Sequence, residues 1–505
     1  MILQRREIVL ELLFYKMIYD KQLKRSMKIL EVLYEAKYSV TIKKLEELLD
    51  VSRKTVFTTL ELARTLLPEA LSLSISENNV ALHNTSTQTI EVTLIEIAQK
   101  TFSFQILEHA FLNKGVNIHE LAEKLFISVS ALSVRIKHIN KVLRDFNCRL
   151  SLYDLQFIGN EANIRYFGYT YFSEFQELYM LVCKEQLPYC VSIYESMMRK
   201  LKAKKMRIIN YSHQQVTRLL LVTRDRLSVG KAIQIEEAFI ERICGRDSYQ
   251  DFRSVYRTEL SNNLGGIEIP ESEIVWAYVA SFNSIIYFPS EAGLLYRDAD
   301  DIQGYKQRVI SFLEEMAYKL NIQVEDKKNF LDTHMAYLIN THLLTQISPV
   351  FQLGSSDVQN YIRDNLGNLH AVWYQALNNS EVNELLPLYD IASVSVQLTM
   401  ISSQFIYSQK AQATKVLYSF EGEAGFVVYL ETLAKTLLPK GVDGVFIYNS
   451  PITLKLVERL KPDIIVYNHE PQEELTDCKT LRMSFIPQIQ EWTLLKELII
   501  NLNYK

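Results

Sequence analysis

The stretch LAEKLFISVSALSVRIKHINKVL, from Leu121 to Leu143, decides the fold class because it joins two short helical patterns across a one-serine break. Leu121 and Leu125 recur at the spacing of one helix face, and Ile127 can fill the corner between the helices. Ser128 suits the N-cap of the second helix, because its hydroxyl can accept a hydrogen bond from a free amide there. The pattern predicts a helix-turn-helix, whose second helix enters the major groove in DNA-binding proteins.

An earlier stretch repeats this pattern. LEELLDVSRKTVFTTLEL begins at Leu45, and its residues match the later copy at a constant offset of 76 positions. Leu45 then corresponds to Leu121, and Ser52 corresponds to Ser128. A helix-corner-helix pattern is common in helical proteins, but two copies at a fixed offset favour DNA binding over a purely structural role.

Each copy is followed by a segment that alternates apolar and polar residues. Leu71–His83 turns at Glu77 and returns, which predicts a β-hairpin. Cys148–Phe167 contains a second, shorter hairpin pattern with its turn near Asp154. The sequence therefore predicts two winged helix-turn-helix units in tandem.

The second copy is the more basic of the two. From Ser128 to Arg149 it has five Lys or Arg residues against one acid, Asp145. Arg and Lys can contact guanine edges or phosphates, and Ser can contact either. We expect Lys141, Arg144 and Arg149 to meet phosphates. The predicted DNA-binding residues are Arg53, Lys54, Thr55 and Thr58 in the first copy, and Ser130, Ser133, Arg135, Lys137, Lys141 and Arg144 in the second.

Composition limits the function classes. At 505 residues, with 48% hydrophobic and 23% charged residues, the chain has the profile of a multidomain globular protein. Its net charge of −4 means that nucleic-acid binding needs a local basic face. No signal peptide or membrane span is evident, and the five scattered cysteines form no metal-site spacing. We expect a cytoplasmic protein without cofactor or metal.

The tandem winged units, the phrase FIGNEANIRYF that closes the second wing, and a long helical middle resemble the Mga/AtxA-type virulence regulators of Gram-positive bacteria. That resemblance implies a mainly α transcription regulator with two phosphotransferase-system regulation domains (PRDs). It also implies a C-terminal α/β domain like the IIB component of the sugar phosphotransferase system. The predicted domains are residues 1–88 and 89–170 for the winged units, 171–288 and 289–410 for the PRD-like bundles, and 411–505 for the IIB-like domain.

The resemblance also implies that histidines near helix starts receive phosphate from the phosphotransferase carrier protein. His213 and His334 are the best candidates, because each follows a Ser or Thr at an apparent helix start. Arg218 and Arg224 could pair with a phosphate on His213. The sequence departs from the family pattern because the second histidine expected in each PRD is missing.

From residue 411 onwards, short apolar strands alternate with amphipathic helices, which predicts a parallel sheet. A phosphotransferring IIB domain places a cysteine just after its first strand, whereas this chain has Ser419, Glu421 and Glu423 in that region. We expect the domain to be inactive in phosphotransfer and to serve in homodimer formation instead.

Two other functions compete with that of a DNA-binding activator. The sequence shows no P-loop, no recognisable Ser-His-Asp order and no HExxH motif, so it does not support a phosphotransfer enzyme. A PRD-type antiterminator would need an RNA-binding head of strands that carry aromatic residues. The N-terminal pattern is helical, so promoter DNA is the expected partner.

Overall fold

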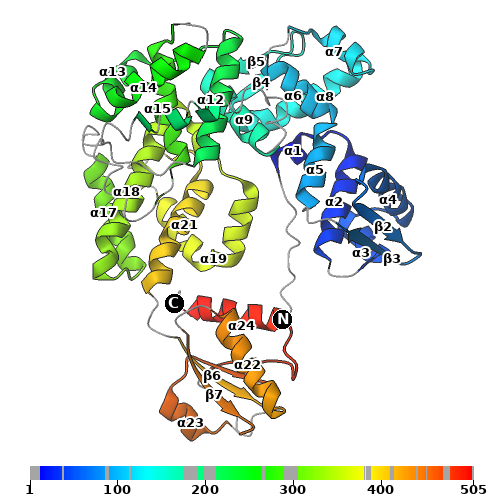
Figure 1. Cartoon of the computed structure of the whole chain (residues 1–505), viewed down its shortest axis with the longest axis vertical. Coiled ribbons are helices and arrows are strands. Elements are labelled where there is room, and N and C mark those ends of the chain that lie inside the picture. The colour runs from blue at the N-terminus through cyan, green and yellow to red at the C-terminus, as the bar shows by residue number, and fades with distance from the viewer. Residues whose placement is uncertain are drawn as a thin grey trace. The chain divides into compact units, whose positions relative to one another are not determined.

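A computed structural model describes the chain at residues 12–36, 39–85, 90–112, 115–175, 190–192, 194–196, 199–200, 212–263, 268–285, 287, 305–379, 382, 388–409, 414–438, 442–450, 452–469 and 478–502. The chain divides into two compact units (Figure 1). The first compact unit holds Met1–Lys306, Met335–Asn360 and Leu386–Ser393, and the second holds Gln307–His334, Tyr361–Leu385 and Val394–Lys505. This division differs from the five predicted domains, whose boundaries stay predictions.

The first winged module, residues 21–84, packs three helices against a small sheet. Asp20, Thr41 and Ser52 cap these helices by accepting hydrogen bonds from backbone amides. The antiparallel strands have the order β1-β3-β2, and the predicted hairpin is confirmed. The elements are α2 (Lys21–Glu35), β1 (Val40–Thr41), α3 (Ile42–Leu49), α4 (Arg53–Leu66), β2 (Leu71–Ile75) and β3 (Asn79–Asn84), preceded by α1 (Leu13–Met17).

The second winged module, residues 90–159, repeats the helix-turn-helix and ends in a shorter hairpin. Asn117 and Glu120 form a capping box at the start of α7. The Asn140 side chain fixes the first strand, because it accepts from the Leu150 amide at 2.7 Å and donates to the Leu150 carbonyl at 2.9 Å. The elements are α5 (Ile90–Gln99), α6 (Phe102–Phe111), α7 (Ile118–Lys124), α8 (Val129–Leu143), η1 (Arg144–Phe146), β4 (Cys148–Leu150) and β5 (Phe157–Gly159).

The rest of the first compact unit is helical and centres on α15 (Glu271–Ser281). Every residue from Glu273 to Ser281 is buried, as expected for a helix at the centre of a bundle. The Trp276 indole donates a hydrogen bond to the Thr223 hydroxyl at 3.0 Å. The other elements are α9 (Glu161–Ser173), α12 (His213–Ser228), α13 (Glu237–Cys244), α14 (Asp247–Asn263), η2 (Phe282–Ser284) and η4 (Pro349–Gln352).

Four of the described helices have residues in both compact units. They are α17 (Tyr305–Lys319), α18 (Val324–Ile347), α19 (Ser356–Leu377) and α21 (Ile391–Gln409). In the second unit, the aromatic rings of Phe330, Trp373 and Phe405 pack together.

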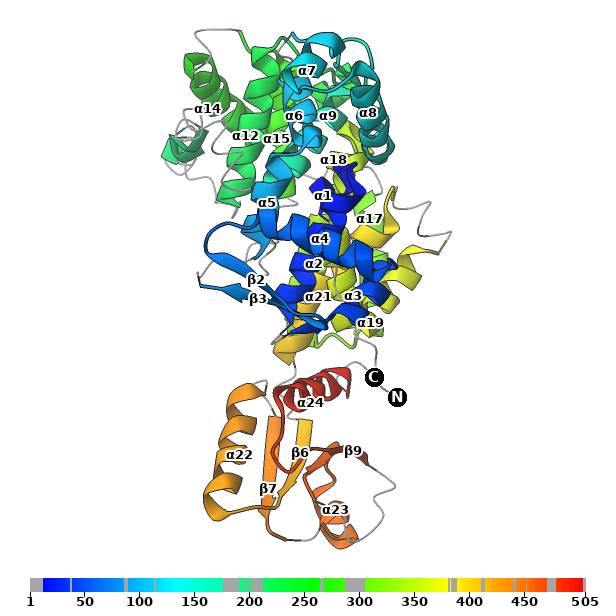
Figure 2. The ribbon, with the colours of Figure 1, turned by 90° about the vertical axis from the view of Figure 1, so that its right-hand side faces the viewer.

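The C-terminal residues form a three-layer α/β domain, as the alternation of strands and helices predicted. Its four parallel strands have the order β7-β6-β8-β9. Trp492 and Leu430 belong to the core on one sheet face, whereas Ile452 and Leu456 belong to the core on the other. Figure 2 shows α22 and α24 on one side of the sheet and α23 on the other. The elements are β6 (Thr414–Phe420), α22 (Ala424–Leu437), β7 (Val442–Tyr448), α23 (Leu454–Leu460), β8 (Ile464–Tyr467), β9 (Lys479–Arg482) and α24 (Ile489–Leu502).

Candidate nucleic-acid interface

The corners of the two helix-turn-helix motifs share one backbone geometry. Asp50 and Phe126, which are 76 positions apart, both adopt the left-handed conformation, with φ of 50° and 54°. The residue after each one donates a backbone hydrogen bond to the preceding helix, from Val51 to Glu46 at 3.2 Å and from Ile127 to Ala122 at 3.0 Å. These two bonds are also 76 positions apart, so the sequence repeat is a structural repeat.

The recognition helices α4 and α8 begin at matching serine caps. Ser52 accepts from the Thr55 amide at 3.4 Å, and Ser128 accepts from the Ala131 amide at 3.1 Å. The first amides of any helix have no acceptor within the helix, and each serine satisfies one of them and fixes where the helix begins. The N-terminal turn is the part of a recognition helix that contacts base edges in helix-turn-helix proteins.

Helix α8 has one apolar face and one exposed polar face. The buried face consists of Leu132, Ile136, Ile139 and Leu143. Ser130, Lys137 and Lys141 are exposed and recur at intervals of seven and four residues, which places them along one line of the helix. Ser133 is half-buried beside this line, and Arg144 is exposed just after the helix ends. A surface with this spacing of hydroxyl and ammonium groups can contact bases and phosphates.

Arg135 lies differently from the other predicted contacts. It is half-buried, and its Nη1 donates to the Ala131 carbonyl at 2.9 Å. Its guanidinium lies over the rings of Phe102 and Tyr19, 4.8 and 5.6 Å from their centroids. This arrangement turns the side chain toward Tyr19, which lies between α1 and α2, and toward Phe102 of α6. Arg135 as a DNA contact therefore stays a prediction that would require the side chain to leave these rings.

Helix α4 presents the corresponding surface of the first module. Arg53, Lys54 and Thr58 are exposed, whereas Thr55 is half-buried and its hydroxyl lies 3.0 Å from that of Ser52. Arg53 reaches the hairpin turn, where its Nη2 donates to the Glu77 carbonyl and to Asn78 Oδ1. The position that Lys137 occupies in α8 is Glu61 in α4, so α8 carries the more positive surface.

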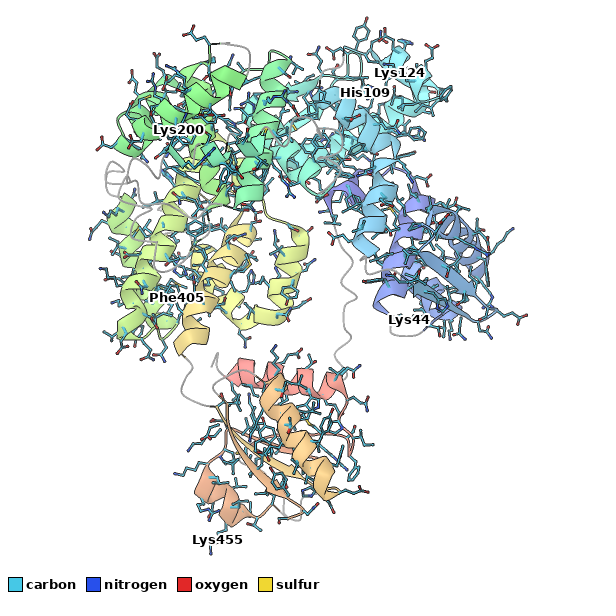
Figure 3. All side chains as sticks on the ribbon, viewed as in Figure 1. Lys44, His109, Lys124, Lys200, Phe405 and Lys455 are labelled. Atoms are coloured by element: carbon cyan, nitrogen blue, oxygen red, sulfur yellow. The ribbon has the colours of Figure 1, made fainter. Side chains whose placement is uncertain are left out.

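The outer surfaces of the modules also carry lysines away from the recognition helices. Lys44 in α3 and Lys124 in α7 are exposed (Figure 3). On the second hairpin, Arg149 is exposed on β4. From the sequence, Arg149 was predicted to contact DNA phosphates, and an exposed position is compatible with that prediction.

A buried ion network joins the second winged module to the neighbouring helices. Arg165 in α9 is fully buried and donates to both carboxylate oxygens of Glu273 at 2.7 and 2.9 Å. Glu161 accepts from Arg165 at 3.2 Å and from Arg226 at 2.8 and 2.9 Å. Arg226 also donates to the Phe111 carbonyl at 2.8 Å. Burial alone would lower the pKa of Arg165, but the adjacent carboxylates raise it above its usual value.

Sequence reasoning missed this network. Arg165 stands between Ile164 and Tyr166, and Glu273 directly precedes the apolar run IVWAYVA. A charge inside an apolar run signals a buried ion pair, because such residues are rarely buried unless paired. The partner could not be identified from the sequence, since 108 positions separate Arg165 from Glu273.

His213 is the first residue of α12, as the sequence predicted, and Ser212 is the N-cap residue. The His213 side chain lies outside the described residues. Of its predicted arginine partners, Arg218 and Arg224 are half-buried on α12, and an Arg224 nitrogen lies 3.9 Å from an Asp225 oxygen. A phosphate on His213 remains a proposal.

For His334, the predicted helix start was wrong. Helix α18 begins ten residues earlier, at Val324, so His334 is inside the helix. Its side chain is fully buried, with Nδ1 2.7 Å from the Phe330 carbonyl and Nε2 2.8 Å from the Ser402 hydroxyl. Its ring stacks on Trp373, and burial lowers the pKa of His334 to about 4. Phosphate could reach either ring nitrogen only after local opening.

Metal sites and membrane-spanning helices are both absent from the described ranges. No group of three or more His, Cys, Asp or Glu side chains there could hold a metal ion. No helix in the described part of the chain has the length and hydropathy that a membrane crossing requires.

The helix-turn-helix region matches a known domain family. The model of the Mga helix-turn-helix domain matches residues 83–172, which include the whole second winged module and most of α9. The match thus covers the module with the more positive recognition helix.

Relatives are similar over most of the chain. A Streptococcus pneumoniae serotype 4 protein named as a trans-acting regulator is 26% identical over 409 residues, 77% of this chain and 78% of that protein. The capsule synthesis positive regulator AcpA of Bacillus anthracis is 20% identical over 406 residues, 77% of this chain and 82% of that protein. The anthrax toxin expression trans-acting positive regulator of Bacillus anthracis is 22% identical over 326 residues, 63% of this chain and 65% of that protein. The chain is thus similar to the Mga helix-turn-helix domain over its second winged module, and to proteins named as trans-acting or positive regulators over 63–77% of its length.

Proposed function

We propose that the chain is a DNA-binding transcription regulator that uses two winged helix-turn-helix modules in tandem. The observation that carries this proposal is the repeated corner geometry, followed in α8 by an exposed line of Ser130, Lys137 and Lys141. Lysines on one line can follow a phosphate backbone while the first turn of the helix meets base edges. The regulator acts in the cytoplasm, on promoter DNA.

The names of the relatives support a positive regulator. Two Bacillus anthracis relatives are named as positive regulators, one of capsule synthesis and one of toxin expression. By analogy, this chain activates virulence or carbohydrate-linked genes. The proposal includes no enzymatic step and no cofactor.

Selection of ligands from a random pool tests the proposal. The full chain is incubated with a random library of duplex DNA, and with a matched RNA library as the alternative ligand. We expect enrichment of a duplex motif, because α4 and α8 present their first turns as groove-reading elements. A Lys54→Ala or Ser130→Ala chain should select an altered motif. Enrichment of RNA alone would favour the antiterminator alternative, and no enrichment of duplex DNA would contradict the proposal.

Regulation by phosphate is the second part of the proposal. A phosphate on His213 would add close to two negative charges at the start of α12. The same helix carries Arg226 13 residues later, about 20 Å along its axis, in the ion network that reaches α9. A change at the start of α12 can therefore reach the second winged module through one rigid element. His334 is the second acceptor, reached only after the core around Trp373 opens.

Phosphate transfer from the carrier protein tests this part. The full chain is incubated with the carrier, its upstream enzyme and labelled phosphoenolpyruvate. We expect rapid labelling that His213→Ala removes, and slower labelling that His334→Ala removes. His83, exposed on β3 in the first module, offers the control variant His83→Ala, which should label like wild type. Equal labelling of all four chains would contradict the assignment.

The C-terminal domain is proposed to join two copies of the chain. It resembles a IIB component without the reactive cysteine, since β6 ends with Ser419 and Phe420, and Glu421 follows the strand. Its helix α22 leaves Val428 and Tyr429 exposed, and apolar helix faces can pair across a two-fold axis. A Val428→Glu and Tyr429→Glu double variant should shift the mass measured by light scattering from dimer to monomer, whereas the exposed control Lys496→Glu should not. A double variant that stays dimeric would contradict this surface.

A further inference from the structure

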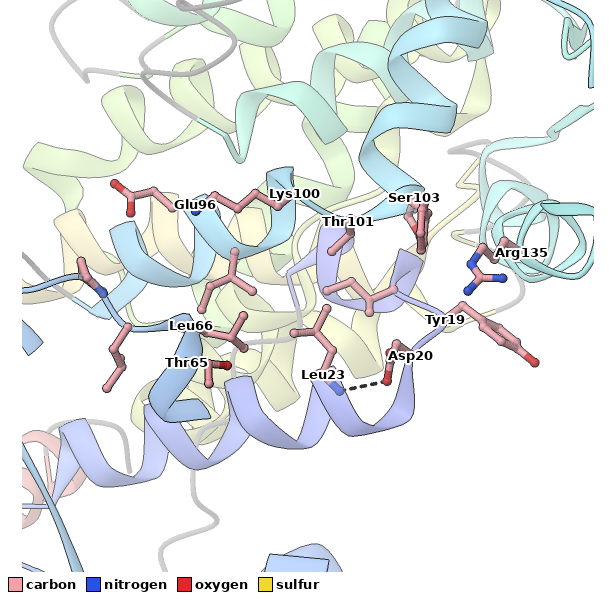
Figure 4. Close-up of a pocket in the computed structure, with 15 residues that line it drawn as sticks. Tyr19, Asp20, Leu23, Thr65, Leu66, Glu96, Lys100, Thr101, Ser103 and Arg135 are labelled. Carbon is pink, nitrogen blue, oxygen red and sulfur yellow. Dashed lines mark hydrogen bonds between the residues drawn. The ribbon is translucent and has the colours of Figure 1, made fainter. Parts of the chain in front are cut away.

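A cavity of about 460 Å³ lies between the two winged modules. Figure 4 shows its lining: α2 and α4 lie below the cavity in this view, α5 and α6 lie above it, and Arg135 of α8 lies at one end. Both recognition helices take part, because Thr65 and Leu66 belong to the last turn of α4 and Arg135 belongs to α8. Small-molecule sites commonly have volumes of roughly 300–1,000 Å³ and combine apolar walls with a few polar groups.

The cavity contains a cation whose donors are mostly unused. A guanidinium has five N–H donors, and Arg135 uses one of them on the Ala131 carbonyl. Among the described residues, no carboxylate oxygen lies within 4 Å of its nitrogens. The rings of Phe102 and Tyr19 hold the group in place through cation–π contacts. Arg135 is therefore preorganised to bind an anion in the fork geometry that suits a carboxylate.

The acidic residues of the lining do not neutralise Arg135. Asp20 accepts hydrogen bonds from the amides of Gln22 and Leu23 at 2.8 and 3.1 Å, so it serves as the N-cap of α2 (Figure 4). Glu96 and Lys100 are drawn at the end of the cavity opposite Arg135 and contribute one charge of each sign.

The remaining wall is mainly aliphatic. It includes Ile18, Leu23, Leu66, Leu67, Pro68 and Ile97. Such a wall favours an apolar body over a sugar, whose hydroxyl groups would lose hydrogen bonds to water without finding partners.

We propose that this cavity is an effector site for a small organic carboxylate with an aliphatic or aromatic body. The carboxylate pairs with Arg135, and the body packs against Leu66, Leu67 and Ile97. Because the wall includes parts of α4 and α8, an occupied site holds the two recognition helices in one relative orientation. Occupancy then changes DNA affinity, since two helices can read one duplex only at a matching spacing. This last step rests on the proposed DNA-binding function.

Ligand binding is measured on the full chain without DNA. The probes are straight-chain carboxylates from butyrate to decanoate, with benzoate and 2-naphthoate, and the primary amide of each acid is the neutral control. Ligand-observed NMR followed by calorimetry ranks them. We expect at least one acid to bind about tenfold more tightly than its amide, because the amide loses the charge-assisted pair. Binding of no acid, or equal binding of acids and amides, would overturn the proposal.

Variants locate the site. Arg135→Gln keeps a polar side chain but removes the charge, and it should weaken the best acid about tenfold while leaving its amide unchanged. Leu67→Trp fills the apolar end and should weaken acid and amide alike. The matched control is Arg64→Gln, an exposed arginine of α4 outside the lining. Equal affinity of wild type and Arg135→Gln for the acid would overturn the assignment, provided that circular dichroism shows the variant to be folded.

DNA measurements keep this proposal separate from the proposed function. Wild-type binding to the selected duplex without acid tests the function alone. Adding the best acid should change that affinity at least threefold in wild type and leave it unchanged in Leu67→Trp. An acid that binds without changing DNA affinity would refute the effector role while leaving the DNA-binding function intact.

Discussion

Phe126 and Asp50 occupy the same turn in the two winged modules, but they suit it differently. A left-handed backbone costs most L-residues about 1 kcal/mol, and Asp and Gly tolerate it best. Phe126 accepts this cost although its side chain is 96% exposed and gains almost nothing from burial. A strained, exposed aromatic residue beside the recognition helix suggests that Phe126 has a role other than stabilising the fold.

Replacing Phe126 with glycine tests this strain. We expect Phe126→Gly to raise the free energy of unfolding by about 1 kcal/mol, because glycine relieves the left-handed conformation and little burial is lost. Chemical denaturation followed by circular dichroism measures the change. The repeat-related Asp50→Gly should change stability by less. A destabilised Phe126→Gly would show that the exposed ring has stabilising contacts.

His334 makes the second compact unit sensitive to acid. Its pKa of about 4 in the folded chain is below the value of about 6.5 expected when unfolded. Between these values the unfolded chain binds the proton and the folded chain does not, so stability is complete above pH 6.5 and falls as the pH drops toward 4. The loss from this group is roughly 3 kcal/mol. Denaturation midpoints at several pH values should fall less steeply for His334→Gln than for wild type, and equal slopes would refute this role.

At the scale of elements, the ion network connects α9, α12 and α15. Arg165 and Glu273 are fully buried, and removing one partner of a buried pair leaves the other charge uncompensated. Arg165 also donates to the Lys231 carbonyl at 2.9 Å, and the Ile233 amide donates to Glu273 at 2.6 Å. The pair therefore organises the loop after α12 as well as the helices.

Neutralising Glu273 should be strongly destabilising. We expect Glu273→Gln to lower the free energy of unfolding by about 3 kcal/mol, since Arg165 keeps only Glu161 as a charged partner. The matched control is Glu271→Gln, two residues earlier, whose half-exposed pairs with Arg253 and Arg257 should contribute less. Similar losses of stability for the two variants in thermal denaturation would show that the buried pair contributes no more than the half-exposed pairs.

The hairpins, the serine caps and the alternation of strands and helices along the C-terminal domain were predictable, because each depends on local sequence. Alternation from Leu71 to Ile75 predicts a strand, and Ser128 before an apolar run predicts a helix start. The orientation of Arg135 was not predictable, because it depends on Tyr19 and Phe102, which come from distant segments. The helix start predicted at His334 was wrong because Thr333 looks like an N-cap residue in the sequence. In the structure, the Thr333 hydroxyl instead donates a hydrogen bond to the Asn329 carbonyl within α18.

At the scale of the whole molecule, DNA affinity has to come from a local surface, because the chain has a net charge of −4. The exposed lysines of α8 provide such a surface, and their field is strongest within about 8 Å at physiological ionic strength. DNA affinity should therefore fall steeply as the salt concentration rises, and the slope of log K against log salt gives the number of phosphates that the protein neutralises.

The salt dependence of DNA binding tests the central claim most directly. Fluorescence anisotropy with the selected duplex is measured for wild type, Lys137→Ala, Lys141→Ala and the control Lys327→Ala, an exposed lysine of α18. The account predicts that each α8 variant binds more weakly and lowers the slope of log K against log salt by about 0.9, the value for one lost phosphate contact, while Lys327→Ala matches wild type. If both α8 variants keep the wild-type affinity and slope, the exposed face of α8 does not bind DNA.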